Sequence, residues 1–172
     1  MATVIGIDLG AYAVKVARLE GRIGKLSVGG YYTRVVDPDG EGSLSDRKKA
    51  ALRELLEEIN VDSATVVAAY PADRTALRQV VLPFTDRSQI EKTLPFELES
   101  HIPFDLEDFV MDYRPLRVGR AVEDRASSRS RVLCALANRK HAQSILSELE
   151  ELGADPRHLV LDSEMIASLS TR

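Results

Sequence analysis

Residues 4–20, VIGIDLGAYAVKVARLE, decide the fold of this chain. The apolar run over residues 4–7 predicts a buried strand, and the alternation of apolar and polar side chains over residues 13–19 predicts a second strand. Between them, the triplet DLG at residues 8–10 predicts a tight turn, because glycine lacks the Cβ that would obstruct a sharp bend. The stretch is therefore a β-hairpin with an acidic residue beside its turn.

The turn of this hairpin has two interpretations. Backbone N–H groups around Gly10 could face a phosphate, Lys15 could reach that phosphate as a point charge, and Asp8 could hold a hydrated Mg²⁺. Alternatively, the hairpin faces solvent, and Asp8 and Gly10 serve only the turn. The D-x-G pattern is too short to separate these interpretations.

The composition is that of a soluble globular protein. Of the 172 residues, 44% are apolar and 29% are charged. This length is enough for one domain or two small subdomains. The net charge of −4 lacks the basic character of nucleic-acid-binding proteins. No apolar run approaches the roughly 20 residues that span a bilayer. The single cysteine, Cys134, lies in an apolar run and is expected to be buried, and one cysteine cannot form an intrachain disulfide. Because the sequence opens without the basic and apolar regions of a signal peptide, we expect the chain to be cytoplasmic.

The first 71 residues predict a β-β-β-α-β order. A third strand over residues 25–36 would complete an antiparallel meander, with a bulge or a close backbone approach at Gly29-Gly30. Ser45 predicts the N-cap of a helix that runs to about Ile59. An apolar run over residues 64–70 predicts the next strand.

Residues 72–137 predict a small inserted α/β subdomain. Its strands are expected at residues 77–82, 109–118 and 131–137. Ser88 and Glu91 fit a capping box at the start of a helix, and Pro95 is expected to bend that helix or to tighten one of its turns. The polar stretch 119–129 predicts a solvated loop.

The chain is then expected to return to the first subdomain, which comprises residues 1–71 and 138–172. Asn138 predicts the cap of a helix over residues 139–152 that stops at Gly153. A short strand over residues 158–161 follows. The last predicted helix starts at Asp162 and places Met165, Ile166 and Leu169 on one face. Because this apolar face arrives at the end of the chain, we expect the chain to be a fragment of a longer protein.

Outside the first hairpin, few residues indicate chemistry. The three histidines lack the spacing of metal ligands, and nucleophile-elbow, P-loop and Rossmann motifs are absent. Asp162 and Glu164 directly follow a predicted strand. A carboxylate there could orient a water molecule, or it could simply cap the helix that follows.

Three segments carry a resemblance to a known family. GIDLGAYAVKVARLEG resembles the first phosphate segment of the actin-like ATPase fold, which many ATPases share. TLPFELESHIPFDLEDFVMDYRPL, residues 93–116, is more specific: it is similar to a segment of PilM, the cytoplasmic actin-like protein of type IV pilus machines, and of the cytoplasmic part of GspL in type II secretion. LVLDSEMIASL, residues 159–169, resembles the strand and helix that connect the two lobes of such proteins.

The resemblance implies the first lobe of an α/β, actin-like (ribonuclease H-like) fold with a small inserted subdomain, and without the second lobe. It also implies that the full-length protein binds ATP and Mg²⁺. Asp8, Gly10, Ala11 and Lys15 would lie at the phosphates, with Mg²⁺ held by Asp8 through water, and Glu164 or the nearby Asp162 would lie at the water-orienting position. Two departures stand out: Ala11-Tyr12 replaces small hydroxyl residues, and the second lobe is absent. We therefore expect this chain alone to bind ATP weakly or not at all.

The resemblance further implies a scaffold rather than an enzyme, peripheral to the inner membrane, that links membrane components to the assembly ATPase. In PilM-like proteins a PilN N-terminal peptide docks on this lobe. Leu94, Phe96, Ile102 and Phe104 are candidates for the wall of such a docking groove; the alternative is that they form the core of the inserted subdomain.

A different function on the same fold is the N-terminal lobe of a small-molecule, sugar-type kinase, in which an aspartate acts as base toward a substrate hydroxyl. The inserted subdomain favours the scaffold, because we find no polar cluster suited to a sugar. Oligomeric state is not readable from the sequence.

Overall fold

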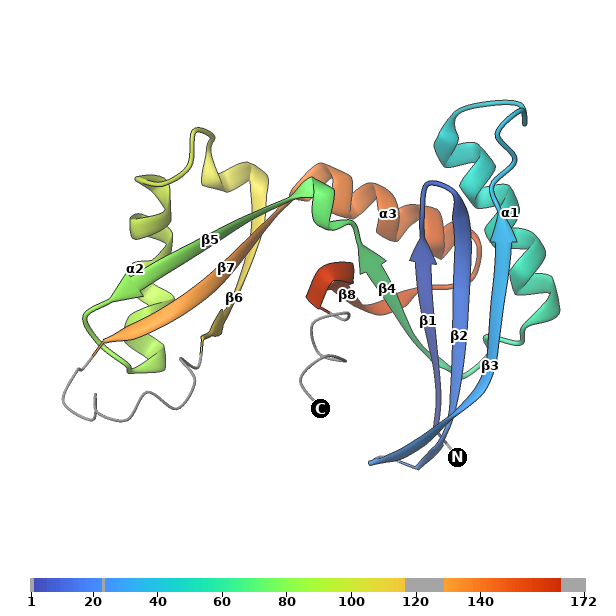
Figure 1. The fold of residues 1–172 in the computed structure, drawn as a ribbon, viewed down its shortest axis with the longest axis horizontal. Helices are drawn as coiled ribbons and strands as arrows, with labels where there is room; N and C mark the ends of the chain where they lie inside the picture. Colours follow the sequence, from blue (N-terminus) through green and yellow to red (C-terminus); the bar gives the residue numbers. More distant parts are fainter. Residues whose placement is uncertain (1, 23, 117–128, 165–172) are drawn as a thin grey trace. The chain divides into compact units, whose positions relative to one another are not determined.

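The structure, a computed structural model, describes residues 2–22, 24–116 and 129–164. The strands are β1 (Ala2–Leu9), β2 (Ala13–Arg22), β3 (Lys25–Val35), β4 (Thr65–Tyr70), β5 (Thr75–Leu82), β6 (Phe109–Pro115), β7 (Ser130–Asn138) and β8 (Pro156–Leu161). The helices are α1 (Leu44–Glu58), α2 (Arg87–Glu99) and α3 (Arg139–Glu151), with short 3₁₀ turns η1 (Ala72–Arg74) and η2 (Leu106–Asp108). These elements alternate as expected of an α/β chain (Figure 1).

The chain divides into two compact units. The first unit comprises Met1–Ala72 and Gln143–Arg172, and the second comprises Asp73–Ala142. The sequence predicted the return to the first subdomain at residue 138, a few residues earlier. The start of α3 belongs with the second unit because the Arg139 guanidinium donates hydrogen bonds to the carbonyl oxygens of Glu107 and Phe109, at 3.4 and 3.1 Å.

The first unit contains a five-stranded sheet in the order β3-β2-β1-β4-β8. Strands β1, β2 and β3 form the antiparallel meander, while β4 runs parallel to β1 and β8 runs parallel to β4. The register passes from Arg18 opposite Gly30 to Leu19 opposite Val28, so Gly29 is the extra residue of a bulge. The predicted β-β-β-α-β order and the bulge are both confirmed.

The core of the first unit lies between this sheet and helices α1 and α3. Its fully or almost fully buried side chains include Ile5, Ile7, Val14, Val16, Leu52, Leu55, Tyr70 and Leu149. The predicted N-cap of α1 at Ser45 is wrong by two residues. The cap is Ser43, which forms a capping box with Asp46, because the Ser45 hydroxyl instead donates to Glu148 of α3 at 2.8 Å.

The second unit contains a three-stranded antiparallel sheet in the order β5-β7-β6, with α2 packed against one face (Figure 1). The predicted capping box of Ser88 and Glu91 is wrong. The cap is Asp86, whose carboxylate accepts the N–H of Gln89 at 2.9 Å, and Glu91 pairs with Arg87 at 2.8 Å instead. The helix continues through Pro95 and ends at Glu99.

The buried cluster of the second unit comprises Val80, Leu82, Ile90, Leu94, Leu98, Val132, Cys134 and Leu136. The predicted burial of Cys134 is confirmed. Burial raises the pKa of its thiol to about 11. The predicted loop at 119–129 lies outside the described residues except for its last position.

The end of the described chain follows the predicted pattern. Gly153 adopts a φ of +75° and stops α3, and the Asn138 side chain accepts the N–H of His141 at 3.1 Å. Helical structure resumes at residues 162–164. The predicted apolar face at Met165, Ile166 and Leu169 lies outside the described residues. No helix in the described part of the chain is long and apolar enough to cross a membrane.

Candidate functional site: hairpin turn and second-unit surfaces

The first candidate site is the turn between β1 and β2. Asp8 and Lys15 lie directly opposite each other on the two strands, and the Lys15 Nζ is 3.1 Å from the Asp8 Oδ2. Both side chains are nearly half exposed. The hydrogen bond and charge of Asp8 raise the pKa of Lys15. Because water screens this pair, it holds the two side chains together only weakly.

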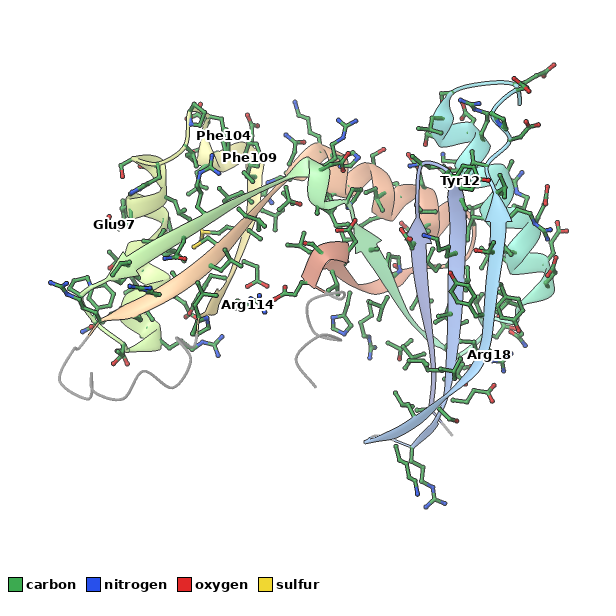
Figure 2. The ribbon with its side chains drawn as sticks, in the orientation of Figure 1. Tyr12, Arg18, Glu97, Phe104, Phe109 and Arg114 are labelled. Carbon is green, nitrogen blue, oxygen red and sulfur yellow. The ribbon has the colours of Figure 1, made fainter. Side chains whose placement is uncertain are left out.

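The turn backbone at Gly10 admits no side chain. A Cβ on Gly10 would lie 2.6 Å from the carbonyl oxygen of Ala13, which is closer than any real Cβ contact. The carbonyl oxygen of Tyr12 accepts the N–H of Val36 at 2.8 Å, so the turn is tied to the end of β3. The Tyr12 side chain is 78% exposed at the tip of the hairpin (Figure 2).

The turn fits a phosphate in part. In the described residues, the backbone N–H groups of Gly10, Ala11 and Tyr12 have no assigned acceptor, and such consecutive donors can bind an anion. Lys15 adds a cation beside them. Side-chain hydroxyl donors are missing at Ala11 and Ala13, and within the described ranges no three acidic, histidine or cysteine side chains gather to hold a metal. Any Mg²⁺ here would depend on Asp8, water and the phosphates themselves.

The Asp162 carboxylate accepts hydrogen bonds from two backbone N–H groups. Its Oδ1 accepts the N–H of Ala72 at 3.1 Å and also the N–H of Ser163, so it ties the end of β4 to the end of β8. The carboxylate is therefore engaged by backbone donors, although neither is the second or third N–H of the following helix that an N-cap would accept. Glu164 is half-buried two residues later.

The four predicted partner-binding residues divide between core and surface. Leu94 is fully buried against the sheet, so its assignment to a groove wall is wrong. Ile102 and Phe104 pack against the same core, and the Phe104 ring stacks on Phe109 with centroids 4.2 Å apart (Figure 2). Phe96 is 73% exposed. Two residues along a helix turn the side chain by about 200°, so Phe96 points away from the sheet that buries Leu94.

The sequence reasoning missed a second surface, which we call the open sheet face. It is the face of the β5-β7-β6 sheet opposite α2, and among the described residues of the second unit no helix packs on it. It comprises the outward-facing residues Leu77, Gln79, Val81, Val110, Asp112, Arg114, Arg131, Leu133, Ala135 and Ala137. Figure 2 shows Arg114 on this side of β6.

Apolar side chains occupy much of the open sheet face. Leu77, Val81 and Val110 are 40%, 52% and 44% exposed. The register places Ala135 beside Leu77 and Ala137 beside Val110, whereas Val81 lies beside Arg131 and Leu133 lies between Gln79 and Arg114. The available signal was that β5 is apolar on both of its faces, which is unusual for a strand with one solvated face.

Comparison with known proteins gives one family. The family model described as "Type IV pilus assembly protein PilM" matches residues 6–169, nearly the whole chain. Among curated proteins there is no match.

Two solved structures are similar. One is described as a PilM–PilN type IV pilus biogenesis complex, with a TM-score of 0.74 and 24% identity over 93% of this chain and 47% of that chain. The other is the cytoplasmic domain of EpsL, an inner-membrane component of the type II secretion system of Vibrio cholerae, with a TM-score of 0.61 and 20% identity over 94% of this chain and 58% of that chain. These likenesses confirm the predicted fold class, and the chain spans about half the length of the structures that it matches.

Proposed function

The chain belongs to the family of the type IV pilus assembly protein PilM, and we propose that it is a scaffold component of a pilus-assembly platform that binds a cytoplasmic segment of an inner-membrane partner. The observation that carries this proposal is the open sheet face. Its exposed Leu77, Val81 and Val110 form an apolar surface on a rigid sheet, and such surfaces mark protein-binding sites.

The proposed occupant is a short extended peptide from a PilN-like protein. An extended peptide presents its side chains with a period of two, so every second side chain could contact the apolar residues of the open sheet face. One structural neighbour is described as a complex with PilN, which supports this choice of partner. The protein would then lie at the cytoplasmic side of the inner membrane through its partner, and would connect that partner to the assembly ATPase.

Nucleotide binding is a further part of the proposal and applies to the full-length protein. ATP would place a phosphate at the N–H groups of Gly10 and Ala11 and at Lys15, with Mg²⁺ held through water by Asp8. Glu164 remains the candidate near the water-orienting position. We propose binding without turnover, because the carboxylate of Asp162 is engaged by backbone N–H groups.

The test is peptide binding to the full-length protein, measured by fluorescence anisotropy with a labelled PilN-like N-terminal peptide. Val81→Asp should weaken binding by roughly tenfold or more, since it places a charge in the proposed apolar contact. The matched control is Val28→Asp, which changes an exposed valine of β3 in the first unit. Phe104→Ala is a poor test, because Phe104 packs on the core and its loss would destabilise the second unit.

Equal affinity of wild type and Val81→Asp would overturn the assignment of the peptide to the open sheet face. Sugar phosphorylation by the full-length protein would overturn the scaffold and support the kinase.

A further inference from the structure

Strand β3 forms a free edge of the sheet in the first unit. The strand order is β3-β2-β1-β4-β8, and among the described residues no strand pairs with the outer side of β3 (Figure 1). The outward N–H and C=O groups of such an edge can pair with a strand of another chain. Proteins usually prevent this with a bulge, a proline or a charged side chain on the edge strand.

The two halves of β3 differ in this protection. The first half carries Lys25, and the bulge at Gly29 interrupts the regular strand. The second half, residues 31–35, has no bulge and no proline, and its one charged residue is Arg34. The Arg34 guanidinium is turned toward α1, where its Nε lies 3.1 Å from a carboxylate oxygen of Glu54. Residues 31–35 therefore form an unprotected edge, which we call the open β3 edge.

The open β3 edge is apolar on one of its faces. Arg34 lies beside the fully buried Val14 of β2, on the face that α1 covers. Because side chains alternate along a strand, Tyr31 and Val35 lie on the opposite face. There they are 64% and 49% exposed. A partner strand at this edge would cover part of both side chains.

The open β3 edge is also complementary to itself. In a two-fold pair of antiparallel strands, each residue lies opposite the residue at the equivalent distance on the other side of the axis. An axis at Thr33 places two threonines opposite each other. Tyr31 then lies opposite Val35, and threonine pairs and aromatic–β-branched pairs both stabilise sheets. Tyr32 lies opposite Arg34, so no like charges meet.

The neighbouring registers are less suitable. An axis at Arg34 would place two arginines opposite each other. An axis at Tyr32 would place Val35 opposite Gly29, where the bulge disturbs the strand. A slip of one strand by a single residue would bring outward and inward side chains together. The strand thus favours the axis at Thr33.

We infer that a second copy of this chain pairs with the open β3 edge, in an antiparallel two-fold arrangement centred on Thr33. The two five-stranded sheets then form one continuous sheet. Charge does not oppose this arrangement, because Lys15, which lies beside Thr33, is paired with Asp8 at 3.1 Å. Since the paired segment is short, the dimer is weak and forms at micromolar concentrations.

The test is sedimentation velocity of the full-length protein over a concentration series that reaches the high micromolar range. Thr33 is exposed, so it can be replaced without disturbing the core. Thr33→Lys and Thr33→Glu should each weaken dimerisation by roughly tenfold or more, because each places two like charges opposite each other. An equimolar mixture of the two variants should dimerise again, because lysine then lies opposite glutamate.

The matched controls are Val28→Lys and Val28→Glu. They change an exposed valine in the protected half of the same strand, outside the paired residues, and should dimerise like wild type.

Three results would overturn the inference. The first is a wild-type protein that stays monomeric throughout the series. The second is a mixture of the two Thr33 variants that fails to dimerise, because the two Thr33 side chains would then not lie opposite each other. The third is equal weakening by the Val28 controls. Binding of the PilN-like peptide should be unchanged in the Thr33 variants, so failure of this inference is distinguishable from failure of the proposed function.

Discussion

Both units cover one face of a β-sheet with helices, but they do so with cores of different size. The first unit buries side chains from a five-stranded sheet and from two helices. The second buries a single cluster between three strands and α2. A small core leaves a larger share of its apolar side chains at the surface. The second unit therefore exposes apolar side chains that can contact a partner, and its stability depends strongly on each of its core residues.

The largest expected effect comes from Leu94→Ala in the second unit. Leu94 is fully buried at the centre of its core, so the substitution should lower the free energy of unfolding by about 2–5 kcal/mol. Phe96→Ala, two residues away on the exposed side of α2, should change it by less than about 0.5 kcal/mol. Urea unfolding of both variants measures the difference.

The reactivity of the Cys134 thiol measures the stability of the second unit separately from that of the first. It is the single cysteine of the chain, it is buried in the same core, and its thiol has a pKa raised to about 11. Labelling by a thiol reagent at neutral pH therefore requires opening of the second unit. Leu94→Ala should accelerate labelling strongly, and Phe96→Ala should leave it unchanged; similar rates in the two variants would contradict the assignment of Leu94 to the core.

The next effect is expected in the first unit, at Gly10→Ala. The added Cβ would meet the carbonyl oxygen of Ala13, so the turn must shift, at a cost of about 1–3 kcal/mol. The matched variant is Gly6→Ala, where no atom lies within 4 Å of the new Cβ and stability should stay equal or rise slightly. Amide hydrogen exchange should show reduced protection in the first unit and unchanged protection around Cys134 in the second unit.

A smaller effect is expected at the start of α1. Ser43→Ala removes the capping hydroxyl and should cost about 1 kcal/mol of stability at neutral pH. The hydrogen bonds from Ser43 lower the pKa of Asp46. A carboxyl whose folded pKa is depressed stabilises the fold above its unfolded pKa, near 4, and this contribution is lost as the pH falls through the folded value.

The difference between wild type and Ser43→Ala should therefore shrink as the pH falls below about 4. Thermal unfolding at a series of pH values checks this. A difference that grows in acid would show that Asp46 does not take part in the cap.

The smallest effect on stability is expected for Lys15→Gln. The pair with Asp8 is almost half exposed, and such pairs contribute less than about 1 kcal/mol. Added salt should reduce the difference further. In the full-length protein the same variant should weaken ATP binding clearly, because it removes the proposed phosphate contact; an unchanged affinity would remove Lys15 from the nucleotide site.

Local pattern predicted most of the elements. The hairpin, the bulge at Gly29 and the stop at Gly153 follow from residues next to one another in the chain, because turn geometry depends on neighbouring φ and ψ angles. The first residues of the helices were harder to predict from the sequence. Ser43 and Ser45 are equally good caps, and the contact of Ser45 with Glu148, more than one hundred residues away, selects between them.

The exposed surfaces could be identified only from the tertiary structure, for a related reason. Leu94 and Phe96 look alike in the sequence, and only the direction in which α2 meets the sheet buries one and exposes the other. Likewise Leu77 and Val81 are exposed because the sheet carries its helix on the opposite face, which the strand pattern alone does not specify. Residues that are neighbours in the sequence thus determined the strands and turns. The choice between core and docking surface was made by packing, because burial depends on residues that are distant in the chain.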